Sequence, residues 1–84
     1  MMNGPTTVNT SAGEQLLAVA ESMARLHGRA TIRLRRGFGR GLLTIDHTED
    51  GLVYTETWRD GYRHDWTELT RDEAVEALER EQPA

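Results

Sequence analysis

The feature that most limits the fold is a change in hydrophobic periodicity, from helical at both ends of the chain to alternating in the middle. Ser11-Ala12-Gly13-Glu14 has the form of a capping box and starts a helix that should end at about His27, before Gly28. Apolar residues cover one half of its helical wheel, so we expect that half to face a core. These residues are Leu16, Leu17, Val19, Ala20, Met23, Ala24 and Leu26.

The middle of the chain is patterned as short strands. Residues 30–35 alternate between apolar side chains and polar or cationic ones, which is typical of a half-buried strand. The glycine-rich residues 36–41 are predicted to form a loop. Further strands are expected over residues 42–47, 52–58 and 62–66, with turns at 49–51 and 59–61.

Turn chemistry also predicts a register. A three-residue loop that closes at Gly61 pairs Glu56 with His64, and a two-residue turn at Asp50-Gly51 closes the preceding hairpin. This register gathers the apolar side chains of the hairpins on one face, whereas a one-residue slip divides them. The expected face contains Leu43, Ile45, His47, Leu52, Tyr54, Trp58, Tyr62 and Trp66.

A second capping box, Thr70-Arg71-Asp72-Glu73, starts a helix that runs to about Glu81 and is nearly surrounded by acids. The predicted fold is therefore α+β, α-β-β-β(-β)-α: a helix, an antiparallel meander of three to four strands, and a helix. We expect both helices to pack on one face of the sheet. Residues 11–82 should form a single domain, preceded by a flexible lead over residues 1–10.

Size and composition narrow the class. A chain of 84 residues buries only about 60% of its unfolded surface, and a homodimer is one way to stabilise it. The chain has no cysteine, which excludes disulfides and thiolate metal sites. Small secreted domains usually carry disulfides, so a cytoplasmic location is expected. No apolar run approaches the roughly 20 residues of a membrane span, and we expect no membrane association.

Charge is segregated along the sequence. All ten basic residues are arginines, whose planar guanidinium suits carboxylates, phosphates and aromatic faces. Residues 1–40 hold six arginines and two acids, a net of +4, and residues 41–84 hold four arginines and twelve acids, a net of −8. These sum to the overall −4. No acid occurs between Ser22 and Ile45, so the basic band has no acidic neighbour in the sequence.

The first candidate site is this basic band with its glycine loop. Arginine grips phosphate or carboxylate, glycine-rich backbone offers N–H groups to an anion, and an exposed phenylalanine stacks on a base. The alternative is a mobile hairpin loop beside a solvated strand face. The candidate anion-binding or partner-binding residues are Arg33, Arg35, Arg36, Phe38 and Arg40.

Two partial resemblances concern RNA-binding families. Arg36-Gly37-Phe38-Gly39 resembles the start of the RNP1 motif of RNA-recognition domains, but Arg40 stands where that family has an aromatic residue. The order helix, three strands, helix resembles the double-stranded-RNA-binding domain, whose second helix begins with basic residues. Here it begins with Asp72 and Glu73. We carry no function over from either resemblance.

Two further groups of residues are candidates for chemistry or recognition. The expected Glu56–His64 pair could act as general base and orienting group, or could be a cross-strand ion pair. The aromatic hairpin is either core or a recognition surface, because tyrosine, tryptophan and arginine dominate binding hot spots. The hot-spot candidates are Tyr54, Trp58, Tyr62 and Arg63. No metal-ligand spacing and no cofactor motif is present, so neither a metal nor a cofactor is expected.

The sequence therefore favours a small non-enzymatic protein-interaction or regulatory module that docks through an arginine and aromatic surface. A protein partner is the first expectation, and a homodimer is a further one. The first alternative is binding of nucleic acid or another polyanion through residues 33–41. The more distant alternative is an enzyme that uses Glu56 and His64.

Overall fold

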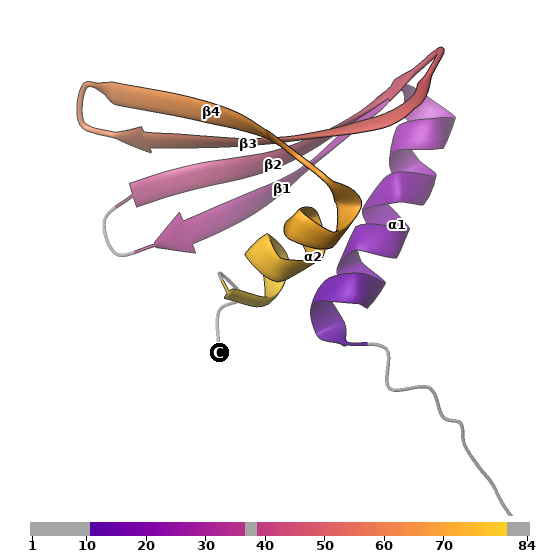
Figure 1. Cartoon of the computed structure of the whole chain (residues 1–84), viewed down its shortest axis with the longest axis horizontal. Helices are drawn as coiled ribbons and strands as arrows, with labels where there is room; N and C mark the ends of the chain where they lie inside the picture. The colour runs from indigo at the N-terminus through magenta and orange to yellow at the C-terminus, as the bar shows by residue number, and fades with distance from the viewer. Residues whose placement is uncertain (1–10, 37–38, 81–84) are drawn as a thin grey trace, which may run out of the picture.

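The computed structural model describes residues 11–36 and 39–80, and it shows, in chain order, a helix, a four-stranded antiparallel sheet and a second helix (Figure 1). Helix α1 spans Ala12–His27 and helix α2 spans Arg71–Arg80. The strands are β1 (Arg29–Arg36), β2 (Gly39–Thr48), β3 (Gly51–Asp60) and β4 (Arg63–Leu69). They pair in chain order, so the predicted α+β meander is confirmed. The expected N-terminal lead, residues 1–10, lies outside the described residues.

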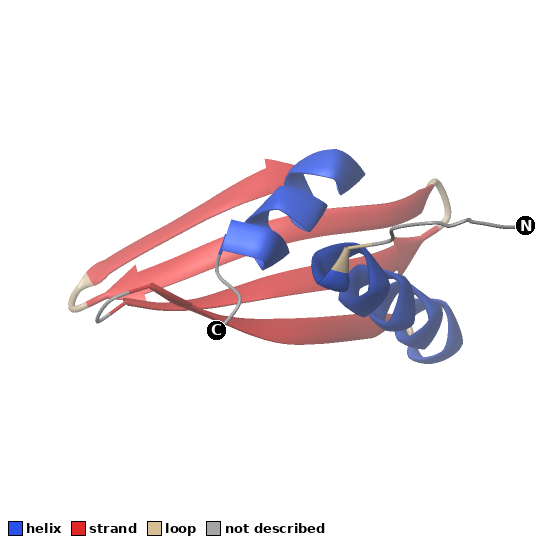
Figure 2. Ribbon diagram, turned by 90° about the horizontal axis from the view of Figure 1, so that it is seen from below, coloured by secondary structure: helices blue, strands red, loops and turns tan. Residues whose placement is uncertain are grey.

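Both helices cover the same face of the sheet, which we call the helix face (Figure 2). Helix α1 packs on β1 and β2, and α2 packs on β3 and β4. The largest fully buried side chains are Leu17, Leu43, Ile45 and Leu78, which come from both layers. The opposite face is covered by no described element, and we call it the open face.

The predicted helix caps are confirmed. The backbone N–H of Glu14 donates to the Ser11 hydroxyl over 3.1 Å, and Gly28 ends α1 with φ 95°. At α2, the Thr70 N–H donates to the Glu73 carboxylate over 2.8 Å, and the Glu73 N–H donates back to the Thr70 hydroxyl over 3.1 Å. Both helices therefore begin where local hydrogen bonding predicts.

Only part of the apolar half of α1 reaches the core, so the expectation for the whole half is wrong. Leu17, Ala20 and Ala24 are buried against the sheet. The remaining large apolar residues stay exposed because a half-circle of apolar side chains is wider than the strip of helix that one sheet covers. They are Leu16 (37% exposed), Val19 (62%), Met23 (45%) and Leu26 (74%).

The predicted glycine loop over residues 36–41 is mostly strand. Arg35 pairs with Arg40, and Leu34 with Gly41, so residues 39–41 belong to β2. Gly41 lies in the strand because Trp58, directly opposite on β3, lays its ring across the glycine. A Cβ at Gly41 would come within 2.9 Å of three ring atoms. Gly41 is needed in the strand because it leaves room for an aromatic ring, whereas the sequence analysis interpreted it as part of a loop.

The faces of β2 and β3 match the prediction, although their pairing differs. Thr48 pairs with Gly51, so the two-residue turn is Glu49-Asp50 and not Asp50-Gly51. This shifts the expected pairing by two residues, which preserves the side of the sheet that each side chain occupies. Leu43 and Ile45 consequently share the helix face with Tyr54, as expected.

The register predicted for β3 and β4 is wrong by three residues, because Glu56 pairs with Thr67 instead of His64. Asp60 pairs with Arg63, and the turn is Gly61-Tyr62. Gly61 has φ 63° and Tyr62 a negative φ, the combination of a two-residue type II′ turn, which matches the strand twist. Because a shift by an odd number of residues changes the face, Trp66 lies on the open face and Leu69 on the helix face. The observed register has a turn that fits the strand twist and puts Leu69 against the core, whereas the predicted register would have put all the aromatic residues of the hairpin on one face.

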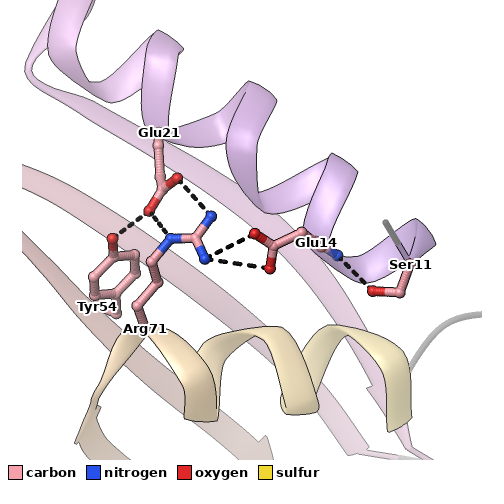
Figure 3. A network of polar contacts seen from close by, with 5 residues as sticks. All are labelled: Ser11, Glu14, Glu21, Tyr54 and Arg71. Atoms are coloured by element: carbon pink, nitrogen blue, oxygen red, sulfur yellow. Dashed lines mark hydrogen bonds and ion pairs between the residues drawn. The ribbon is translucent and has the colours of Figure 1, made fainter. Parts of the chain in front are cut away.

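A network of polar side chains ties the two helices to the sheet (Figure 3). Arg71, at the start of α2, donates to both oxygens of Glu21 on α1, over 2.8 Å and 3.2 Å. It also forms an ion pair of 2.9 Å with Glu14, about two turns before Glu21 on α1. The hydroxyl of Tyr54, from β3, donates to Glu21. One carboxylate thus joins α1, α2 and β3.

The network shifts the titration of its members. Burial of Glu21 acts to raise the pKa of its carboxyl, but hydrogen bonds from Arg71 and Tyr54 outweigh it and hold that pKa below 4.5. Burial and the bond to Glu21 raise the pKa of the Tyr54 hydroxyl to about 12. The hydrogen bonds that Arg71 donates to Glu21 and Glu14 raise the pKa of its guanidinium. The ionised forms of Glu21 and Arg71 therefore stabilise the fold.

We predict that Arg71→Met lowers the free energy of unfolding by about 3 kcal/mol. It leaves the Glu21 carboxylate buried without its cation, and the partial exposure of Arg71 (38%) favours the lower end of the range for breaking a buried ion pair. Urea unfolding measures the change. The control is Arg63→Met on an exposed strand position, which should change stability by about 0.5 kcal/mol or less. Equal losses in the two variants would contradict a stabilising role for the network.

We also predict a pH dependence that belongs to Glu21. Its folded pKa is lower than its unfolded pKa, so between these two values the unfolded chain binds more protons. The free energy of unfolding should therefore fall as the pH falls below about 4.5. In Glu21→Gln this part of the fall is absent, whereas Glu68→Gln, an exposed carboxylate on β4, keeps it. Urea midpoints at a series of pH values measure both slopes.

Candidate anion-binding face

Four basic side chains form a row across the open face. Arg35 pairs with Arg40, Arg40 with Arg59, and Arg59 with His64, so every strand contributes one residue at directly opposed positions. We call these four residues the basic row. Strands in a sheet lie about 4.8 Å apart, so the row spans about 14 Å. All four residues are exposed.

The next row along the strands supplies apolar and aromatic contacts. It runs from Arg33 through Leu42 and Thr57 to Trp66. Trp66 is 68% exposed, and Tyr62, in the turn beyond β3, is fully exposed. An open hollow of about 890 Å³ is lined mainly by these two rows. The arginines of both rows therefore line this hollow, and Trp66 lies on the same face of the sheet.

The basic row has no carboxylate partner within the described residues. None of the ion pairs there includes Arg35, Arg40 or Arg59. On the same face, Asp46 is paired with Arg29 over 2.6 Å. Glu68 is four residues beyond His64 on β4, about 13 Å along the strand. The exposed acids of α2 belong to the helix side, so the row keeps its positive charge.

Like charges at directly opposed positions of a sheet destabilise it. The basic row contains two such contacts in succession, Arg35 with Arg40 and Arg40 with Arg59. Like charges that face each other with no neutralising acid in the described structure are typical of a functional site. The arrangement is suited to an anion that bridges several strands.

The structure brings together most of the predicted anion-binding residues. Arg33, Arg35 and Arg40 share the open face. The side chain of Arg36 lies outside the described part of the structure, as does Phe38. Arg59 and His64 were missed as members of the site because the sequence analysis put Arg59 in a turn and His64 opposite Glu56. Alternation counted from the correct turn, Gly61-Tyr62, identifies both.

The structure divides the predicted hot-spot residues between different surroundings. Tyr54 is 7% exposed and belongs to the core. Trp58 packs half-buried against the core, and Arg63 lies on the same side of the sheet as Trp58. Tyr62 is exposed as expected, and Trp66 joins it as the second exposed ring.

The structure separates the predicted catalytic pair. Glu56 pairs with Thr67 on the helix face, and His64 pairs with Arg59 on the open face. The three-residue change in register places the two side chains on opposite sides of the sheet, so they cannot act together as base and orienting group. One oxygen of Glu56 is buried without a hydrogen-bond partner. Within residues 11–36 and 39–80, no three histidine, aspartate or glutamate side chains come close enough to share a metal ion.

Comparisons with protein families, with curated proteins and with solved structures find no match to this chain. Neither of the two described helices is long and apolar enough to cross a bilayer. Functional inference therefore depends on the open face itself.

We predict that Arg40→Glu stabilises the fold by up to about 1 kcal/mol, because it places an acid between two arginines on neighbouring strands. The matched control is Arg63→Glu, which makes the same charge change opposite Asp60 and should destabilise the fold. Thermal or urea unfolding gives the sign of each effect. A loss of stability in Arg40→Glu equal to that in the control would contradict the strain assigned to the basic row.

Proposed function

We propose that this protein is a non-enzymatic binding module that holds single-stranded nucleic acid on the open face of its sheet. The observation that carries the proposal is the basic row, three arginines and a histidine on four successive strands without an acid between them. Guanidinium groups bind phosphate through two parallel hydrogen bonds. The row offers a track for a phosphate backbone across the strands.

The exposed aromatic ring beside the basic row favours nucleic acid as the ligand over an anion that has no bases. Trp66 is two residues from His64 on the same face of β4, about 7 Å along the strand, within the length of one nucleotide. Stacking of a base on an exposed ring contributes about 1–3 kcal/mol and tolerates any base. Single strands expose the faces of their bases, whereas a duplex hides them. The combination therefore favours a single strand.

The net charge of −4 does not oppose this binding, because the acids are segregated. The described acids of α2 lie with the helix layer, on the other side of the sheet from the basic row. Phosphate contacts depend on the local field and weaken within about 10 Å at moderate salt. The sheet thus separates a positive surface from a negative one.

A second candidate ligand is an acidic segment of a protein partner. The observation in its favour is the uncharged centre of the open face, where Leu42 is 40% exposed beside Thr57. Exposed tryptophan, tyrosine and arginine are the residues most enriched in protein-binding hot spots. Such a segment would use the same basic row, and the binding experiment below separates the two ligands.

We predict that the protein binds a fluorescently labelled oligothymidine in an anisotropy titration at low salt. Arg40→Glu should abolish this binding, and Trp66→Ala should weaken it by about 1–3 kcal/mol through lost stacking. Arg63→Glu makes the same charge change on the helix face and should have a much smaller effect. Three arginine–phosphate contacts give a slope of about −2 in a plot of log affinity against log salt.

Polyglutamate is the competing probe in the same titration. Failure of the oligonucleotide to bind at low salt would overturn the proposal, and binding of polyglutamate alone would favour the acidic protein segment. Equal losses in Arg40→Glu and Arg63→Glu would show that overall charge, and not the basic row, determines binding.

A further inference from the structure

Helix α1 carries a second apolar stripe that the fold leaves uncovered. Its large members are Leu16, Val19, Met23 and Leu26, all exposed. Their spacing is three, four and three residues, which is the a–d–a–d pattern of a coiled coil. The buried stripe of the same helix, with Leu17, is separate and packs on the sheet. We call the four exposed residues the α1 seam.

The spacing of the seam indicates that its partner is a helix. Residues repeated at this period stay in line along a neighbouring helix, and each enters a space between side chains of that neighbour. A matching space is present: an apolar hollow of about 350 Å³ between α1 and β1, lined by Leu16, Val19, Met23 and Ile32 among others. A side chain of the facing helix can enter it.

The surroundings of the seam favour a second copy of this chain over a charged partner. On a helical wheel, the positions that flank the seam on the side away from the core are Gln15 and Ser22, which carry no charge. Two such helices therefore meet without like charges at this flank. A seam of four residues is also self-complementary when the helices run antiparallel, because Leu16 then faces the partner's Leu26 and Val19 faces the partner's Met23.

We propose that α1 mediates a two-fold symmetric homodimer in which the two α1 helices pack antiparallel along their seams. A chain of this size gains stability from burying these side chains, because its own core is small. Helix α1 lies on the helix side of the sheet, so the contact leaves the open face accessible. The proposal stands on the seam alone and does not depend on what the open face binds.

Light scattering after size-exclusion chromatography, over a range of protein concentrations, tests the dimer. We expect the mass of two chains, and the mass of one chain for Val19→Glu. Ala18→Glu, also exposed on α1 but outside the seam, is the matched control and should stay dimeric. Circular dichroism checks that both variants are folded. A wild-type protein that is monomeric at all concentrations, or a Val19→Glu variant that remains dimeric, overturns the proposal.

Cysteine cross-linking tests the antiparallel arrangement, without background because the chain has no cysteine. A disulfide needs Cα atoms within about 7 Å. Leu16→Cys mixed with Leu26→Cys should therefore form a disulfide-linked pair, while each variant alone should not. Cross-linking of each variant with itself would show parallel helices, and no cross-link in the mixture would place the contact elsewhere. Either result overturns the proposed geometry.

Discussion

The carboxylate of Glu21 is the point at which the three parts of the fold meet. It accepts hydrogen bonds from Arg71 at the start of α2 and from Tyr54 on β3, while its own helix packs on β1 and β2. A buried charge of this kind is costly unless it is paired, so the helices and the sheet are held in one relative arrangement. That arrangement puts both helices on one side and leaves the other side of the sheet open.

The local elements could be predicted from the sequence because their causes are local. A serine or threonine cap with a glutamate three residues later determines where each helix begins, and Ser11 and Thr70 both act as caps. Alternation determines the faces of β1, β2 and β3 even though the pairing of β2 with β3 is displaced by two residues. The α+β order and the shared face of Arg33, Arg35 and Arg40 follow from these rules.

The features that could not be predicted depend on choices between similar local solutions or on distant contacts. A three-residue loop at Gly61 and the observed two-residue turn are both accepted hairpin geometries. They differ in length by one residue, so the side chains of β4 lie on the opposite face from the one predicted. The pairing of Glu21 with Arg71 joins residues fifty positions apart and leaves no periodic trace in the sequence. Arg59 and His64 could join the basic row only after the turn was known.

Two surfaces of the described structure depart from ordinary packing, and they lie on different sides of the sheet. On the open face, cations stand directly opposite one another, which costs stability and is reversed by a bound anion. On α1, apolar side chains remain exposed to water at the spacing of a coiled coil, which is unfavourable. A second helix packed against them would remove that apolar surface from water. Since the sheet separates the two surfaces, an anion and a second chain can be bound at once. A dimer would then present two basic rows, and joining two binding surfaces strengthens attachment to a polymer far more than it does to a small anion.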